Sequence, residues 1–322
     1  MIINHIDDYF YPYPVNDDAG KRVPFPDDDS YARAAAAGNK LPRDDWRRQN
    51  VDRLVERMYA ETKKVKPWVL VGVSPFGIWR PGNPQGVVGF DPYTSLYADA
   101  RKWLREGWVD YWTPQLYWKV DSQGQPYGKL LAWWQGENVK QRHLWPGNYT
   151  SQVKELPAGK TPTDKDWTAK EIVRQIAVTR RTRGATGNVH FSYKALAGDW
   201  GGVAEALEQG PYKEAALIPE TTWLGGEPAE RPKIVPTAFD NRVHVALSLP
   251  SEKRPWQWVV RLRTDRGWRT AIVPGRRSTY SFPLEQGRKP LEVAASAVTR
   301  LGAEGAVVRA KVAAVAPAAV GK

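Results

Sequence analysis

Two adjacent carboxylates near the start of the chain, Asp7 and Asp8, have the residue type and spacing for acid–base chemistry. They follow a short apolar run at residues 2–6 and precede an aromatic, proline-rich segment at residues 9–14. A short apolar run that ends in polar and proline residues predicts a buried strand. Acids at the exit of such a strand lie where α/β folds keep their catalytic groups. Taken alone, the pair is more typical of a turn or a helix cap, so the remaining chain has to decide between these two interpretations.

Four further short apolar segments predict strands. Two are at residues 69–73 and 109–113, each followed by an aromatic and polar exit, and residues 143–149 and 188–194 each hold a strand together with its exit. Segments between them predict helices at residues 43–64, 91–107, 127–137, 168–184 and 203–209. Alternation of strands and helices is typical of parallel βαβ units. We therefore expect an α/β fold of the (β/α)8-barrel type, with its site at the carboxyl ends of the strands. Five strands cannot close such a barrel, so we expect it to be incomplete.

Capping signals define the ends of two predicted helices. Asp91 and Pro92 predict an N-cap and a first helical position, and Gly107 predicts the end of that helix. Thr168 and Glu171 have the spacing of a capping box.

The helix at residues 43–64 is expected to bury one apolar face, made by Val51, Leu54, Val55 and Met58. Residues 15–40, which precede it, are polar and predict a loop. The acid run at residues 27–29 within that loop is expected to be solvated surface, with a cation site as the minor alternative.

The C-terminal part has a different pattern and a different charge. Short strands separated by turn residues are predicted at residues 243–247, 257–262, 268–273, 280–282, 291–299 and 306–312. This spacing predicts a β-sandwich of immunoglobulin or fibronectin type III appearance over residues 232–316, after a first domain at residues 1–228. Residues 232–322 carry 16 Lys/Arg and 6 Asp/Glu, whereas residues 1–231 carry 31 and 29. The basic character therefore belongs to the C-terminal part, which argues against a nucleic-acid-binding catalytic region.

Several classes of protein are disfavoured by composition. The sequence has no apolar run long enough to span a membrane and no basic-then-apolar start typical of a signal peptide. It has no Cys, and its four His lack the spacing of metal ligands. We therefore expect neither a metal nor another cofactor. Binding to nucleic acid is motivated only by the pI near 9.7, and no nucleic-acid motif supports it.

Four strand exits together resemble the glycosyl-hydrolase-10-like family. The matching motifs are Asp7-Asp8-Tyr9-Phe10-Tyr11-Pro12-Tyr13-Pro14, Ser74-Pro75-Phe76-Gly77-Ile78-Trp79-Arg80, Pro114-Gln115-Leu116-Tyr117-Trp118 and His190-Phe191-Ser192-Tyr193. The family consists of bacterial, usually exported (β/α)-barrel proteins, and some members cut peptide-free peptidoglycan strands. The resemblance implies a partial barrel of about strands four to eight, because its first motif ends the fourth strand in the family. It also implies that strands one to three and an export signal are missing from this sequence.

The resemblance implies a glycoside hydrolase of bacterial cell-wall glycan, located in the periplasm or outside the cell. By analogy with hexosaminidases that use the substrate's own acetamido group, Asp8 is expected to be the general acid/base and Asp7 to orient the acetamide. Like charges so close would raise the pKa of one carboxyl group, which suits an acid. A nucleophile from a later strand is the alternative, but Asp110 and Glu137 are badly placed for it.

Polar and aromatic residues at the strand exits are candidates for binding the sugar. Arg80 could bind a carboxylate such as the lactyl group of muramic acid, and a structural role is an equal alternative. Gln115 and Tyr117 could hydrogen-bond sugar hydroxyls. The candidate stacking platforms and further contacts are Tyr9, Tyr11, Trp79, Trp118 and Tyr193, and core packing is the stronger alternative for any single aromatic residue.

Two functions from different classes remain after this comparison. The first is a glycoside hydrolase whose substrate is a polysaccharide, expected to be an anionic cell-wall glycan held in part by the basic C-terminal domain. The second is an inactive, truncated barrel that serves as a carbohydrate- or wall-binding protein. Release of soluble glycan products distinguishes the two.

Overall fold

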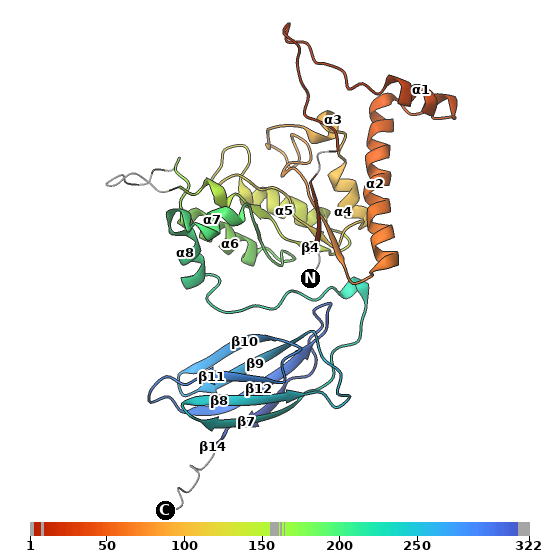
Figure 1. Cartoon of the computed structure of the whole chain (residues 1–322). Coiled ribbons are helices and arrows are strands. Elements are labelled where there is room, and N and C mark those ends of the chain that lie inside the picture. Colours follow the sequence, from red (N-terminus) through yellow and green to blue (C-terminus); the bar gives the residue numbers. More distant parts are fainter. Residues whose placement is uncertain (1–2, 8–9, 155–160, 162, 164, 315–322) are drawn as a thin grey trace, which may run out of the picture. The chain divides into compact units, whose positions relative to one another are not determined.

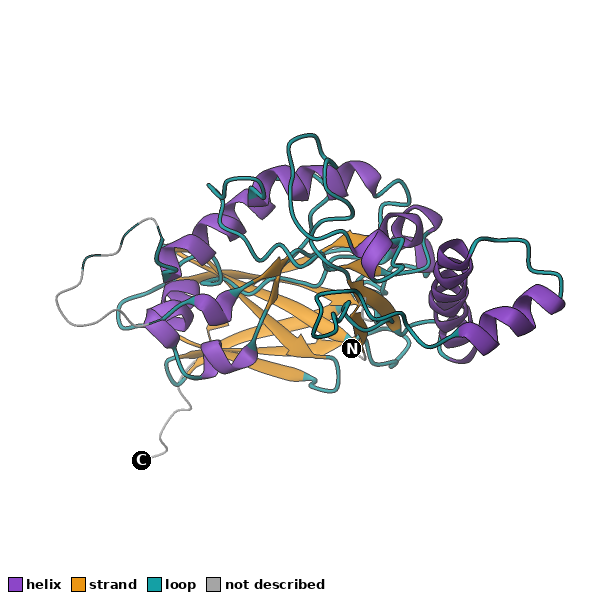
Figure 2. Cartoon of the chain, turned by 90° about the horizontal axis from the view of Figure 1, so that it is seen from above, coloured by secondary structure: helices purple, strands orange, loops and turns teal. Residues whose placement is uncertain are grey.

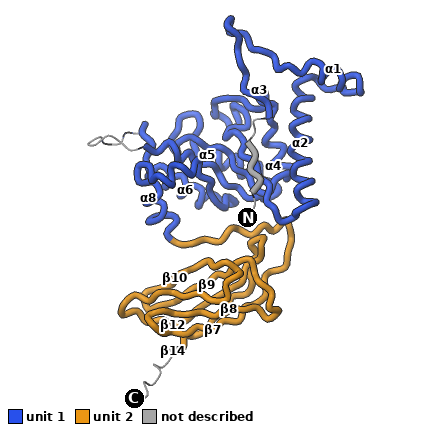
Figure 3. Tube along the Cα trace, viewed as in Figure 1, with its two compact units in different colours: residues 1–213 blue, residues 214–322 orange. Residues whose placement is uncertain are grey.

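The computed structural model describes residues 3–7, 10–154, 161, 163 and 165–314, and for residues 3–7 and 314 it describes the backbone alone. The chain divides into two compact units, Met1–Lys213 and Glu214–Lys322 (Figure 3). The sequence placed the linker between domains at residues 219–232, which lie within the second unit. The reason is local contact: the Thr221 backbone N–H donates to the Leu301 carbonyl at 2.8 Å. Gly302 also approaches the backbone so closely that a Cβ there would lie 3.0 Å from the Pro219 carbonyl oxygen.

The strands of the first unit are parallel. β1 (Ile3–Asp7), β2 (Leu70–Ser74), β3 (Tyr111–Trp112) and β4 (His143–Leu144) form one sheet in this order, and β5 (Gly147–Asn148) pairs with β6 (Val189–His190). A bridge between Gln115 and Gly147 connects the two sheets. The five predicted strands are confirmed, with residues 143–149 divided into two short strands. Within the described part of the chain, these strands form no closed barrel.

Helices follow the strands along the chain, as the alternating pattern predicted. In Figure 2 the helices of this unit follow one another in an open arc. Neighbours along the arc pack together in the order α2, α4, α5, α6 and α8. The helices are α1 (Asp28–Ala36), α2 (Arg43–Val65), α3 (Pro92–Ser95), α4 (Ala100–Glu106), α5 (Tyr127–Glu137), α6 (Ala169–Arg181), α7 (Tyr193–Ala197) and α8 (Val203–Gln209), with 3-10 turns at Thr150–Gln152, Trp200–Gly202 and Thr222–Leu224 (Figure 1).

Three tryptophans are among the largest fully buried side chains of this unit. Trp103, Trp112 and Trp134 are fully buried. The Trp103 indole donates to Asp52 at 2.7 Å, and the Trp134 indole donates to the Gly77 carbonyl at 2.8 Å. Buried indoles with hydrogen-bond partners contribute large apolar areas without an unsatisfied polar group. The prediction that most Trp residues pack in the core agrees with these contacts.

Three local predictions are wrong. Residues 28–36 form α1 rather than a loop, and Leu54 is 46% exposed rather than part of the buried face of α2. The helix predicted at residues 91–107 breaks into α3 and α4, because Tyr97 adopts φ 56° while its side chain is buried. The predicted ends of that segment are confirmed. The Asp91 side chain accepts from the Thr94 N–H, and Gly107 adopts the left-handed conformation that ends α4.

The predicted capping box before α6 is also wrong. Thr168 occupies the N-cap position but makes no side-chain capping hydrogen bond. Glu171 instead accepts hydrogen bonds from the Val120 N–H at 2.8 Å and from the Gln175 amide at 3.1 Å. A tertiary contact with the loop after β3 therefore takes the carboxylate that the local pattern assigned to the helix end.

The second unit is a β-sandwich, as predicted. Its sheets have the strand orders β10-β9-β12-β13 and β11-β8-β7-β14, and inward-facing residues of both sheets share one apolar core. The first strand of this unit, β7 (Lys233–Phe239), was not predicted. The assignment of the sandwich to the fibronectin type III class stays a prediction. The strands are β7 (Lys233–Phe239), β8 (Arg242–Ser248), β9 (Gln257–Thr264), β10 (Gly267–Pro274), β11 (Thr279–Pro283), β12 (Pro290–Val298), β13 (Val308–Lys311) and β14 (Ala313–Ala314). Across the described residues, no helix is both long enough and apolar enough to cross a membrane.

Candidate active site

The carboxyl ends of the parallel strands meet at one edge of the first unit. Asp7 is the last residue of β1 and lies opposite Ser74, the last residue of β2. This position at the carboxyl edge is the one that the sequence predicted for Asp7. Asp8 and Tyr9 lie outside the described residues, so the catalytic roles of the acid pair stay predictions.

A row of aromatic rings runs along this edge from the exit of β1 to the exit of β3. Tyr13 packs on Phe90 with ring centroids 5.3 Å apart, Phe90 on Phe76 at 5.5 Å, and Phe76 on Trp118 at 6.0 Å. Tyr13 follows β1, Phe76 follows β2 and Trp118 follows β3. The row therefore joins three strand exits that are far apart in the sequence.

A second aromatic cluster continues the row from the exit of β3 to the exit of β6. Tyr117 lies 4.8 Å from Tyr149 and 5.6 Å from Phe191, between ring centroids. Tyr149 also contacts Trp167 at 6.2 Å. Tyr117 of the cluster and Trp118 of the row line the same cavity, so the row and the cluster meet in one feature. We call it the aromatic band: Tyr13, Phe76, Phe90, Tyr117, Trp118, Tyr149, Trp167 and Phe191.

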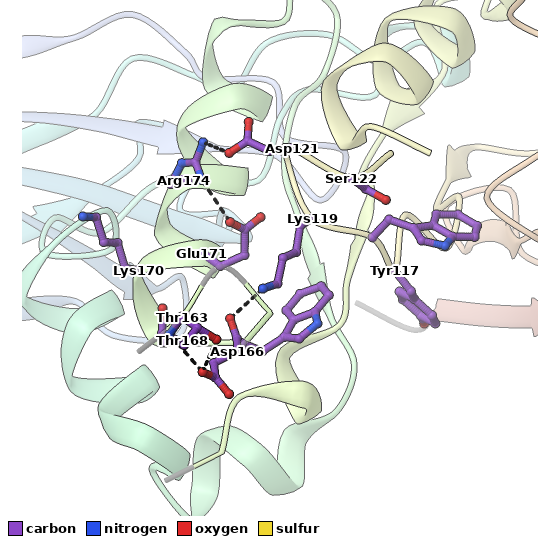
Figure 4. Close-up of a pocket in the computed structure, with 12 residues that line it drawn as sticks. Tyr117, Lys119, Asp121, Ser122, Thr163, Asp166, Thr168, Lys170, Glu171 and Arg174 are labelled. Atoms are coloured by element: carbon purple, nitrogen blue, oxygen red, sulfur yellow. Dashed lines mark hydrogen bonds and ion pairs between the residues drawn. The ribbon is translucent and has the colours of Figure 1, made fainter. Parts of the chain in front are cut away.

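A cavity of about 690 Å³ lies at the same edge, between the loop after β3 and the start of α6 (Figure 4). Three members of the aromatic band, Tyr117, Trp118 and Trp167, line it. Its polar lining residues are Lys119, Asp121, Ser122, Thr163, Asp166, Thr168, Lys170, Glu171 and Arg174. Pockets with aromatic walls and a few placed polar groups are typical of small-molecule and sugar sites.

Several charged groups of this cavity have partners among its own lining residues. Arg174 bridges Asp121 at 2.7 Å and Glu171 at 3.3 Å. The Lys119 ammonium donates to the Asp166 carbonyl oxygen at 2.6 Å, and the Asp166 carboxylate accepts from the Thr163 hydroxyl at 2.7 Å (Figure 4). The lining carries three cations and three acids. The lining therefore carries no formal net charge.

Tyr11, a predicted stacking platform, lies in a separate aromatic cage. Its ring contacts Phe25 at 4.9 Å and Tyr97 at 4.8 Å, and the Arg47 guanidinium lies 6.0 Å from its centroid. Burial, reinforced by the charge of Asp27, raises the pKa of the Tyr11 hydroxyl. A smaller cavity of about 270 Å³ beside the exit of β1 is lined by Tyr11, Phe25, Arg47 and Tyr97.

Asp28 and Asp29 are exposed, as predicted for the acid run, but Asp27 is buried. Its side chain is 7% exposed and accepts hydrogen bonds from Arg47 at 2.7 Å and 2.6 Å. These hydrogen bonds outweigh burial and lower the pKa of the Asp27 carboxyl group. The positively charged partner of the Asp27 carboxylate is therefore the Arg47 guanidinium of α2.

Trp79 and Arg80 contact their own chain. The Trp79 indole donates to Asp99 at 2.9 Å and its ring stacks on Trp133 with centroids 6.0 Å apart. Arg80 pairs with Asp91 at 3.3 Å and lies 4.5 Å over the Tyr93 ring. Neither lines the 690 Å³ cavity. These contacts favour the structural alternatives that the sequence left open for both residues.

The remaining predicted sugar-binding residues divide between the band and the open surface. Tyr117 and Trp118 belong to the aromatic band and line the larger cavity. The Gln115 amide donates to the Ser74 carbonyl at 3.0 Å, between the exits of β2 and β3. Tyr193, the first residue of α7, is 79% exposed and does not line the cavity.

Several residues of the band were not predicted as site residues. Tyr149 and Phe191 follow predicted strands, so their position at strand exits was a usable signal. Trp167 lies far from any strand exit in the sequence, just before α6, and only the fold brings it to the cavity.

Asp110 and Glu137, the alternative nucleophiles, have structural partners. Asp110 precedes β3, is fully buried, forms an ion pair with Lys63 and accepts from the Val71 N–H at 2.8 Å. Glu137 ends α5 and accepts from Arg101 and Arg105, each at 2.8 Å. Asp110 therefore lies at the amino end of its strand, away from the carboxyl edge, as the sequence indicated.

His143 makes the stability of this unit depend on pH. The side chain is 3% exposed, and burial lowers its pKa to about 4, below the ordinary value of 6.5. Unfolding restores the ordinary pKa, so the unfolded chain binds the proton more readily between these values. The stabilisation is complete above pH 6.5 and is lost as the pH falls toward 4, by about 1.4 kcal/mol per pH unit. Urea unfolding followed by Trp fluorescence between pH 7 and 4 measures this slope.

The variant His143→Asn should unfold with a shallower pH dependence. His244→Asn, which changes a residue of the other unit, is the matched control and should leave the slope of the first unit unchanged. An unaltered slope in His143→Asn would show that other groups cause the acid sensitivity.

The chain matches the family model described as "Glycosyl hydrolase-like 10" over residues 3–169. It is 36% identical over 245 residues to "Glycosyl hydrolase YngK" of Bacillus subtilis (strain 168), covering 73% of this chain and 45% of that protein. It is 36% identical over 132 residues to "Glycosyl hydrolase DigH" of Escherichia coli (strain K12), covering 40% and 28%. The chain thus spans less than half the length of these curated relatives.

The sandwich is also similar to a solved structure, the fn3 domain of human collagen alpha-1(XX) chain. That similarity covers 30% of this chain and 97% of the other, at 20% identity and a TM-score of 0.23. The TM-score is too low to establish the type of sandwich.

Proposed function

Because the chain belongs to the glycosyl hydrolase-like 10 family, we propose that it is a glycoside hydrolase that acts on bacterial cell-wall glycan. The family match favours hydrolysis, and the aromatic band supports a sugar substrate. The rings of the band lie along the carboxyl edge, which includes Asp7 at the end of β1. Aromatic faces stack on the apolar faces of sugar rings. The cavity at Trp118 and Trp167 adds paired polar groups that suit sugar hydroxyls.

The proposed substrate is a peptide-free peptidoglycan strand, whose sugars carry acetamido groups. In the proposed mechanism the acetamide oxygen attacks the anomeric carbon while Asp8 protonates the leaving oxygen. Asp7 orients the acetamide and stabilises the positive charge that it gains. Asp8 then removes a proton from water, which opens the cyclic intermediate and restores the acetamide. Action on this substrate would place the protein in the periplasm or outside the cell.

A glycan-binding protein without catalysis is the second candidate. The aromatic band favours it as strongly as it favours hydrolysis, because stacking rings serve binding in either case. Incubating the chain with purified, peptide-free glycan strands separates the two functions. Soluble saccharides detected by mass spectrometry indicate hydrolysis, whereas co-sedimentation with the strands and no released products indicates binding alone.

Trp118→Ala should weaken co-sedimentation with these glycan strands about tenfold, because truncating a central aromatic contact commonly costs more than 1 kcal/mol of binding free energy. Trp68→Ala is the matched control. Trp68 is 43% exposed and lies just before β2, at the amino edge of the sheet. Thermal unfolding of both variants checks that they fold. Equal loss of binding in the two variants would argue against the carboxyl edge as the glycan site.

A further inference from the structure

Two loops meet at one end of the C-terminal sandwich. Residues 249–256 precede β9 and residues 275–278 follow β10. The loops lie side by side because β9 and β10 pair in antiparallel fashion, with Gln257 opposite Pro274. The Gly275 N–H donates to the Trp256 carbonyl at 2.9 Å, and a Cβ at Gly275 would lie only 1.8 Å from the Pro255 carbonyl oxygen. Glycine is therefore required for this close approach of the two loops.

The sandwich core holds the second loop in place. The Trp258 indole, on a side chain that is 2% exposed, donates to the Arg277 carbonyl at 2.9 Å. The Leu247 N–H donates to the Ser278 carbonyl at 2.7 Å. The carboxyl end of the segment is thus hydrogen-bonded to residues of β8 and β9, and its amino end is hydrogen-bonded to the first loop.

Four exposed cations gather on these loops: Lys253, Arg254, Arg276 and Arg277, which we call the basic quartet. They line a cavity of about 260 Å³ whose lining contains one acid, Glu252. Within the described part of the chain, the side chains of Arg254, Arg276 and Arg277 make no ion pair or hydrogen bond. Like charges held this close repel one another, and a bound anion relieves the repulsion.

Some arginines elsewhere on the sandwich have acidic partners, whereas Arg242 and Arg269 donate to backbone carbonyl oxygens. Arg263 and Arg309 pair with Glu292 at 3.1 Å and 3.5 Å, and Arg261 pairs with Glu304 at 3.4 Å. The basic quartet lies outside these ion pairs. At this end of the sandwich, the cavity lining has four cations and one acid.

An adjoining cavity of about 470 Å³ extends the site. It shares Lys253, Arg254 and Pro255 with the first cavity. Trp256, which is 41% exposed, lies on its wall with the Arg300 guanidinium 4.7 Å from its ring centroid. Glu227 and Glu230 also line it, and Glu230 accepts a hydrogen bond from the Ser251 N–H at 3.2 Å. The extended site thus offers an aromatic face beside a run of cations.

We propose that this end of the C-terminal unit binds a linear polyanionic polysaccharide whose repeating charges are carboxylates or phosphates. Arginine guanidinium groups bind both anions in bidentate fashion, and an exposed indole stacks on a sugar ring. The site has room for several successive anionic groups along the two cavities. The requirement for an anion comes from the basic quartet, and the choice of a polysaccharide rests on the proposed function.

Affinity electrophoresis of the whole chain tests this proposal. The probes are polygalacturonate, which carries carboxylates, phosphomannan, which carries phosphates, and neutral dextran. Retardation by at least one charged probe and none by dextran is expected. The variant Arg276→Gln/Arg277→Gln should lose at least about tenfold in affinity for the retarding probe. The control Arg266→Gln/Lys289→Gln removes the same charge from the opposite end of the sandwich and should change affinity less than about twofold.

Three results would overturn the proposal. The first is that neither charged probe retards the chain, and the second is that both double variants lose affinity equally. The third is that double-stranded DNA of equal charge concentration displaces the polysaccharide, which would indicate a nucleic-acid site. Glycan cleavage is measured on the same samples with peptide-free strands. Cleavage without polyanion binding contradicts this proposal alone, whereas polyanion binding without cleavage contradicts the proposed hydrolase alone.

Discussion

Asp8→Asn should lower the rate of glycan cleavage about 10²- to 10⁴-fold, the usual contribution of a general acid–base group. The asparagine amide cannot deliver a proton to the leaving oxygen or accept one from water. Its size and hydrogen-bonding capacity are close to those of the carboxyl group, so co-sedimentation with glycan strands should remain. Release of reducing ends from peptide-free peptidoglycan strands measures the rate.

Asp18→Asn is the matched control for this substitution. Asp18 is an exposed acid in the polar segment that follows the same strand exit. The control should cleave glycan at the rate of the unaltered chain. Full activity in Asp8→Asn would remove this residue from the mechanism and leave the family resemblance without its predicted catalytic acid.

Arg47→Met should lower the free energy of unfolding of the first unit by about 3–5 kcal/mol, the range for removing one partner of a buried ion pair. The substitution leaves the Asp27 carboxylate, which is 7% exposed, without the two hydrogen bonds that hold it ionised. It also removes the guanidinium that donates to the Tyr97 hydroxyl and lies 4.8 Å over that ring. Urea unfolding at pH 7, followed by Trp fluorescence, measures the change.

Lys64→Ala is the control, since it breaks an exposed pair on the same helix. Lys64 and Glu61 are 2.7 Å apart, with side chains 69% and 54% exposed. Such a pair contributes at most about 1 kcal/mol. The double variant Asp27→Leu/Arg47→Met should recover much of the loss, because it leaves no buried charge unpaired. A loss in Arg47→Met no larger than in Lys64→Ala would show that water solvates Asp27 in the folded protein.

The sequence alone determined most elements of the fold, and it predicts the site at the carboxyl edge of the parallel strands. Apolar runs such as residues 69–73 predict strands because a buried parallel strand needs apolar residues on both faces. Asp91 and Gly107 marked helix ends because capping depends on residues next to each other in the chain. The strand-exit motifs carried the family resemblance, and the carboxyl ends of parallel strands meet at one edge in any such fold.

Only the tertiary structure decided which side chains share that edge and what each one contacts. Asp27 had the appearance of a solvated acid, but Arg47 of α2 lies beside it in the fold. Glu171 had the spacing of a capping residue, but the backbone of Val120 takes its carboxylate. Trp167 joins the cavity through the packing of α6 against the loop after β3. Each outcome depends on a partner 20 or more residues away, and local propensity contains no information about contacts at that separation.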